Sequence, residues 1–205
     1  MARVDDYIAA RRLAAEKLAR EPVEAIIDRT GLSKGEDRTP RLRFLDRTYR
    51  IQYPGFEFAD IEKPDQDIPL QEQVLILHYM VGADKQRRPG NWVAYREIPG
   101  AGFYFPVFVK RAIDPLKGVF GRDLEAFRRC CRRLDGKALE AGDAGFQFQV
   151  FPQLALQLIL WAADDEFASE ANILFSEATG ACLSPEDTAW LAGMVVYRLL
   201  ALNRT

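Results

Sequence analysis

The sequence has little of what many catalytic and metal-binding motifs require. It contains one histidine, His78, in 205 residues, which excludes sites built on several histidines, such as a His₃ zinc centre or an HExxH helix. A Ser-His-acid triad would have to use His78, and no GxSxG elbow is present. The glycine-containing segments 100–102 and 142–145 lack the GxGxxG and GxxxxGK patterns, so no motif predicts nucleotide binding. The sequence therefore identifies no cofactor and predicts no metal site.

Cysteine is also scarce. Two of the three cysteines, Cys130 and Cys131, are adjacent, which gives neither a CxxC motif nor a disulfide framework. A reduced, cytoplasmic setting is the expectation that follows.

Long apolar runs and a charge excess are missing as well. The longest nearly apolar runs, around residues 74–81 and 189–196, are shorter than the roughly 20 residues of a membrane-spanning helix. The first residues, MARVDDYIAARR, contain no apolar signal core, so we expect no export signal. A net charge of −2 gives no steering toward nucleic acid or acidic membranes. We expect no membrane partner, and nucleic acid is the least favoured partner.

What the sequence does contain is a strong pattern over residues 146–175. Phe146, Phe148 and Val150 alternate with glutamines, the period of a strand with one buried face. Residues 154–160 repeat this pattern with apolar residues on both faces, which is typical of a central strand. Pro152-Gln153 is the predicted turn between them.

The remaining segments complete an α+β prediction: a single domain over residues 1–205, with an antiparallel sheet whose central hairpin (146–162) packs against several helices. An N-terminal helical segment (1–31) precedes a main body (41–205). Helices are predicted at 4–18, 23–29, 70–81, 123–134 and 185–202, with short helices over 103–120, a hairpin over 41–53, further strands at 91–98 and 173–175, and an acidic loop at 56–67.

Several groups of residues carry functional hypotheses, and each has a structural alternative. Asp164, Asp165 and Glu166 follow the apolar strand. Carboxylates there can have raised pKa values or share a cation, and Asp164 and Glu166 can point the same way; alternatively they end the strand and cap the next element. His78, within an apolar helix, is either a general base or ligand or a hydrogen-bonded residue near the core.

Two further groups of residues also allow both a functional and a structural interpretation. Residues 128–133 place four arginines around Cys130 and Cys131, a face that can grip an anion, activate a thiol, or merely be solvated. The acidic loop 56–67 has oxygen ligands but no regular calcium-site spacing, so a solvated loop is favoured. An aromatic segment, 103–105, suggests the wall of a pocket. The residues predicted to bind a ligand there are Arg96, Glu97, Tyr104, Arg111 and Trp161.

Taken in order, these segments resemble a prokaryotic family, domain of unknown function 3786. The resemblance covers roughly residue 22 to the C-terminus. It rests on Ile76-Leu77-His78-Tyr79, the run 95–100 with Tyr104, Phe120-Gly121, the run 161–167, Ile173-Leu174-Phe175 and the helix start at 183–187.

The resemblance implies a cytoplasmic protein of anaerobe-type prokaryotes with no established activity. Some relatives look fused to a small iron–sulfur domain, which implies a context of redox or corrinoid metabolism. This chain has no four-cysteine cluster motif. The resemblance also groups His78, Arg96, Glu97, Asp164 and Glu166 as site candidates.

Three functional hypotheses follow. The favoured one is an accessory module that binds a small ligand or cofactor. The second is an enzyme with His78, Asp164 and Glu166 as catalytic residues and Arg96 orienting an anionic substrate. The third is an interaction protein, either a homodimer through helix 185–202 or an acidic partner docked on the arginine face.

Overall fold

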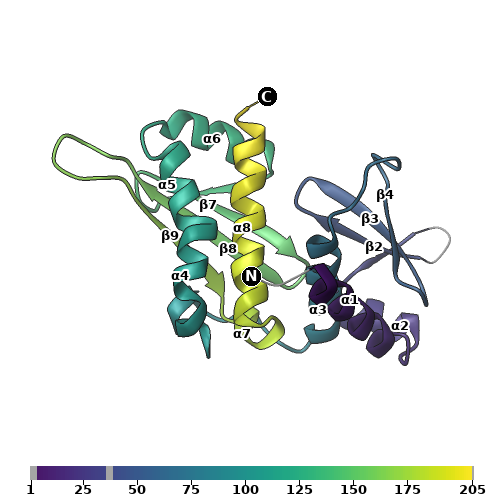
Figure 1. Cartoon of the computed structure of the whole chain (residues 1–205). Helices are drawn as coiled ribbons and strands as arrows, with labels where there is room; N and C mark the ends of the chain where they lie inside the picture. The colour runs from purple at the N-terminus through teal and green to yellow at the C-terminus, as the bar shows by residue number, and fades with distance from the viewer. Residues whose placement is uncertain (1–3, 36–38, 205) are drawn as a thin grey trace. The chain divides into compact units, whose positions relative to one another are not determined.

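The structure, a computed structural model, describes residues 4–35 and 39–204. Contacts divide the chain into two compact units: the first comprises residues 1–88 and 151–153, and the second residues 89–150 and 154–205. Each unit contains helices and one sheet of antiparallel strands (Figure 1). The predicted α+β class is confirmed. The expected boundary between an N-terminal segment (1–31) and a body (41–205) stays a prediction.

The first unit pairs a four-stranded meander with helices. The predicted hairpin over 41–53 forms, with Leu42 opposite Tyr49 and both side chains buried. The prediction of an acidic loop over 56–67 is partly wrong, because residues 57–60 form a strand that pairs with the second strand of the hairpin. The elements are α1 (Val4–Leu18), α2 (Val23–Thr30), β1 (Ser33–Lys34), β2 (Pro40–Phe44), β3 (Arg47–Gln52), β4 (Glu57–Asp60) and α3 (Leu70–Gly82), with sheet order β1-β2-β3-β4.

An aromatic stack lies at the centre of the first unit. The ring of Tyr79 on α3 stacks on Phe151 with centroids 4.2 Å apart, and Phe44 of β2 lies 5.1 Å from the same ring. Gln153 lies in the turn that follows Phe151. Its side-chain Nε2 donates to the Arg29 carbonyl at 2.5 Å, and its Oε1 accepts from the Asp84 amide at 3.1 Å. The turn 151–153 is therefore part of this core.

The second unit contains the predicted central hairpin. Its two strands are joined by the Pro152-Gln153 turn, and β8 lies in the middle of the sheet, as its two apolar faces predicted. Residues 91–98 form a strand only over the first part, and residues 137–139 add an edge strand. The strands are β5 (Trp92–Ala94), β6 (Lys137–Leu139), β7 (Ala144–Phe151), β8 (Leu154–Trp161) and β9 (Glu170–Ser176), in the order β5-β9-β8-β7-β6.

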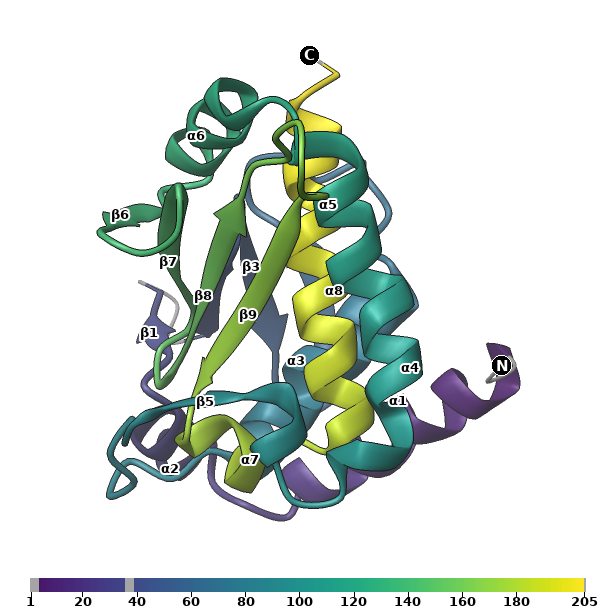
Figure 2. The ribbon, with the colours of Figure 1, turned by 90° about the vertical axis from the view of Figure 1, so that its left-hand side faces the viewer.

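Helices cover one face of this sheet (Figures 1 and 2). The short helices expected over 103–120 form and follow one another without a break. Pro106 and Pro115 each lie in the first turn of a helix, where proline is tolerated. The helices are η1 (Tyr95–Glu97), η2 (Ala101–Tyr104), α4 (Phe105–Phe108), the π-helix η3 (Val109–Ile113), α5 (Asp114–Phe120), α6 (Leu124–Arg133), α7 (Ala178–Cys182) and α8 (Pro185–Leu202).

The last helix, α8, begins as predicted. Ser184 is its N-cap and accepts a hydrogen bond from the Asp187 amide at 3.1 Å, and Pro185 occupies the first helical position. The apolar side of α8, including Leu191, Val195 and Leu199, is buried, and the helix packs against α4, η3, α5 and α6. Among the described residues, no helix is long and apolar enough to cross a membrane.

Candidate functional site

The predicted site residues belong to both units, and those of the second unit form two groups. His78 belongs to α3 of the first unit. Within the second unit, one group lies on η1, η2 and η3: Arg96, Glu97, Tyr104 and Arg111. A second group lies in the β8–β9 connection: Trp161, Asp164 and Glu166. The aromatic pocket predicted to join Trp161 to Tyr104 stays a prediction. Trp161 pairs with Glu170 at one end of β9, whereas β5 pairs with the other end (Figure 2).

The β8–β9 connection borders an open hollow of about 500 Å³. Two of its walls are aromatic: Trp161 is 40% exposed and Phe167 is 69% exposed. Charged side chains come from α5, from the residue before β7 and from β9, and Ser169, just before β9, supplies a hydroxyl group. The lining residues are Lys117, Asp143, Trp161, Ala162, Asp164, Phe167, Ala168, Ser169 and Glu170.

Backbone hydrogen bonds hold the walls of the hollow in place. The Ala163 amide donates to the carbonyl of Gly121 at 2.9 Å, which ties the connection to the end of α5. The Ala162 amide donates to the Asp143 carboxylate at 2.8 Å, and the Asp143 amide donates to the Leu160 carbonyl at 3.0 Å. The hollow is therefore built from both α5 and the strand edge.

The indole of Trp161 lies close to the backbone of Gly142. The φ of this glycine is +60°, and a Cβ there would lie 2.8 Å from the Leu160 carbonyl and 3.3 Å from Cε2 of Trp161. A side chain would clash with backbone as well as strain the turn. The indole of Trp161 consequently rests close to the main chain at Gly142.

Asp164 fixes the connection itself. Its Oδ1 accepts from the amides of Glu166 at 2.9 Å and Phe167 at 2.7 Å, and these bonds lower the pKa of the fully exposed carboxyl group. The expected raised pKa at this strand end is wrong for Asp164, because the group is solvated and hydrogen-bonded rather than buried. The arrangement corresponds to the structural alternative, a carboxylate that caps a turn.

The residues on η1, η2 and η3 combine aromatic rings with charge, and several of them contact α8. Tyr95 donates to the Pro185 carbonyl at 2.7 Å, and Tyr104 lies 3.5 Å from the Glu186 carboxylate. Arg111 stacks on the ring of Trp190 at 4.1 Å. Burial first, and then the nearby Tyr104 hydroxyl, raise the pKa of Tyr95 to about 12, so this phenol stays neutral.

Arg96 and Glu97 make local contacts. The Arg96 guanidinium lies 3.7 Å from the ring centre of Phe105, and the Glu97 carboxylate accepts from the Ala94 amide at 2.5 Å. Glu97 thus caps the short helix η1. These two side chains fix the local chain, and their predicted roles in ligand binding stay predictions.

His78 is half-buried on α3 between fully buried neighbours. It belongs to the first unit, whereas the acids at residues 164–166 belong to the second. Its predicted catalytic role therefore stays a prediction.

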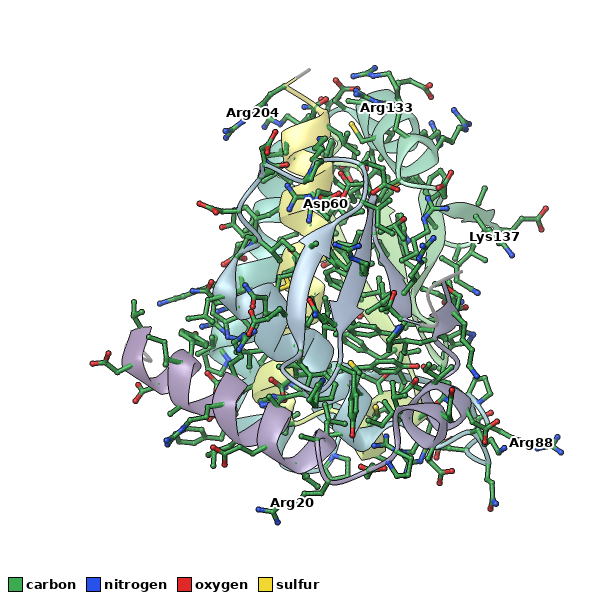
Figure 3. All side chains as sticks on the ribbon, turned by 90° about the vertical axis from the view of Figure 1, so that its right-hand side faces the viewer. Arg20, Asp60, Arg88, Arg133, Lys137 and Arg204 are labelled. Carbon is green, nitrogen blue, oxygen red and sulfur yellow. The ribbon has the colours of Figure 1, made fainter. Side chains whose placement is uncertain are left out.

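The arginine face of α6 has partners within the second unit. Arg128 bonds Glu125 at 2.6 Å and the Asp143 carbonyl at 2.6 Å, and Arg129 bonds Asn203 at 3.3 Å. Arg133 donates to the Leu202 carbonyl at 2.8 Å, where it neutralises the end of α8; Arg204 extends from the same end of the chain (Figure 3). Three of the four arginines thus make contacts that hold α6 in place.

A buried ion pair joins β3 and β4 of the first unit. Arg47 and Asp60 lie 3.4 Å apart and are 7% and 2% exposed. Figure 3 shows Asp60 beside the strands, whereas Arg20 and Arg88 extend outward. Asp60 also borders a second hollow, lined by Asp65, Asp67 and Gln73 among others. No group of three or more His, Cys, Asp or Glu side chains suited to a metal ion occurs among residues 4–35 and 39–204.

Sequence reasoning identified Trp161 and Asp164 but missed much of the hollow. Phe167 carried a signal, because an apolar residue directly after three acids does not suit a purely solvated turn. Lys117 and Glu170 carried none, since they are ordinary charged residues until α5 and β9 bring them to the same hollow.

Comparison with known proteins agrees with the resemblance in the sequence. Residues 22–198 match the family model described as "Domain of unknown function (DUF3786)". No curated protein and no solved structure matches the chain. The match spans most of the chain and includes every residue that lines the hollow. The chain therefore belongs to the family of domain of unknown function DUF3786.

Proposed function

We propose that this protein is a module that binds a small ligand, and that the hollow at the β8–β9 connection is its binding site. One observation carries the proposal: Trp161 and Phe167 expose large aromatic surfaces at a hollow whose backbone is fixed to α5 and β7. Exposed apolar surface that is rimmed by polar residues is typical of a ligand-binding or partner-binding site.

The dimensions and the lining support the same proposal. Ligand sites typically enclose about 300–1,000 Å³ and combine aromatic walls with a few polar groups. The hollow has about 500 Å³, and Lys117, Ser169 and Glu170 supply the polar groups.

The test uses the three tryptophans of the chain as reporters. In protein labelled with ¹⁵N-tryptophan, each indole N–H gives one NMR signal, and the variants Trp161→Phe and Trp92→Phe assign two of them. Trp92 is the matched control, because it is 38% exposed against 40% for Trp161 but lies on β5, at the opposite end of β9. A screen of small molecules should yield binders that shift the Trp161 signal and leave Trp92 in place.

The variant Trp161→Ala should abolish binding of those molecules, whereas Trp92→Ala should not change it. Binders that shift only Trp92 or Trp190, or a screen in which the Trp161 signal never moves, would contradict the proposed site.

A further inference from the structure

Two opposite charges in the hollow have no partner. Lys117 and Glu170 both line it, and no side-chain hydrogen bond or ion pair within 4.0 Å is found for either among the described residues. The two other carboxylates of the hollow are already engaged, since Asp143 accepts from Ala162 and Asp164 from its own loop. Lys117 is thus the one basic residue of the lining, and among the described residues Glu170 is the lining carboxylate whose oxygens accept no hydrogen bond from the protein.

Glu170 lies beside the aromatic wall. Trp161 and Glu170 are direct partners in the antiparallel pairing of β8 and β9, so their side chains lie on the same face of the sheet, with Cβ atoms roughly 5 Å apart. A carboxylate next to an exposed indole suits an organic cation, because the cation gains both an ion pair and an attraction to the ring face. A positively charged group therefore suits this end of the hollow better than a negatively charged one.

Lys117 provides the opposite preference. It lies in the last turn of α5, is half-buried and lines the hollow. An ammonium group without a partner attracts a carboxylate, and partial burial strengthens that attraction relative to a fully solvated pair. A molecule with a single charge would satisfy one of these two groups and leave the other unpaired.

We propose that the ligand of this hollow is a zwitterion of the free amino-acid type. Its ammonium group binds at Trp161 and Glu170, its carboxylate binds Lys117, and its apolar side chain contacts the ring of Phe167. This inference rests on the proposed function, because it names the ligand class of the same site.

The test compares matched molecules by the NMR signal of the Trp161 indole. The free proteinogenic amino acids are titrated at millimolar concentration, and the strongest binder is compared with its amide, which keeps only the positive charge, and its N-acetyl derivative, which keeps only the negative charge. Each charge removed should weaken binding about fivefold, the upper range for exposed ion pairs.

Two variants identify which side chain recognises which charge. Glu170→Gln should weaken binding of the amino acid and its amide but leave the N-acetyl derivative unchanged. Lys117→Gln should weaken binding of the amino acid and its N-acetyl derivative but leave the amide unchanged. Glu166→Gln is the matched control, because it removes the same charge from the connection at a residue that does not line the hollow.

The outcomes separate the two proposals. If molecules of another class shift Trp161 and amino acids do not, or if Glu170→Gln and Lys117→Gln bind every compound as the unmodified protein does, the ligand class is wrong and the binding site stands. If no compound of any class shifts the Trp161 signal, both the ligand class and the proposed function are wrong.

Discussion

Burial has a larger effect on the thiol pKa values of Cys130 and Cys131 than the neighbouring positive charges have. Four neighbouring arginines suggested an activated thiol, since positive charge lowers a thiol pKa. Both side chains are fully buried. Burial raises the pKa of Cys130 in spite of Arg129 and Arg133, and it raises the pKa of Cys131 strongly. The arginines lie on the exposed side of the amphipathic helix α6, and the cysteines lie on its buried side.

We therefore predict that both thiols are inert in the folded protein. In alkylation with iodoacetamide at pH 7.5, followed by mass spectrometry, Cys182 should react first because it is half-buried. Cys130 and Cys131 should react only in denaturant. Rapid labelling of either one in the folded protein, at a rate similar to that of a free thiol, would show that the arginine face does activate it.

At the scale of the element, the β8–β9 connection owes its form to one carboxylate. Because backbone amides lower the pKa of Asp164 in the folded state, its stabilising contribution is present above the unfolded pKa of about 3.9. That contribution is lost as the pH falls through the lower, folded value. The connection should therefore keep its form at neutral and mildly acidic pH and open only in strong acid.

The corresponding prediction concerns the amides of Glu166 and Phe167. In ¹H–¹⁵N spectra recorded from pH 7 to pH 2, their signals should shift together with a midpoint below that of an ordinary aspartate, and Asp164→Ala should displace them already at pH 7. Asp165→Ala is the control and should leave them in place. If Asp164→Ala and Asp165→Ala have the same effect, the hydrogen bonds to Asp164 do not shape the connection.

Elements with strong local signals were the predictable ones. The alternation in residues 146–160 and the Ser184-Pro185 start of α8 determine strand faces and a helix boundary through short-range chemistry alone. Short edge strands such as β6, with three residues, have no such pattern, because they form only when a longer neighbour offers its backbone. Glu57–Asp60 was taken for a loop for the same reason, since β3 supplies its hydrogen-bonding partner.

The candidate site was harder to predict than the fold. Trp161 and Asp164 stood out by their place after an apolar strand, but the predicted set joined residues that the structure separates. The hollow that Trp161 and Lys117 share, and the approach of Tyr104 to Glu186, depend on which helix end meets which strand end. No local pattern in the sequence encodes that pairing.

At the scale of the whole molecule, the chain passes between its two units within one hairpin. Strands β7 and β8 belong almost entirely to the second unit, but the turn 151–153 belongs to the first. Phe151 is 1% exposed and stacks on Tyr79. The hairpin that organises the second unit therefore also supplies the central ring of the first unit's core.

We predict that Phe151→Ala destabilises the first unit selectively. Loss of a buried phenylalanine costs about 3–5 kcal/mol, so hydrogen exchange measured by mass spectrometry should show lost protection in α3 and β2 while α8 keeps its protection. Phe148→Ala, which removes a side chain 2% exposed on β7, is the matched control and should expose the second unit first. If either variant releases both units to the same extent, they unfold as one cooperative structure, and the chain is a single domain in the thermodynamic sense.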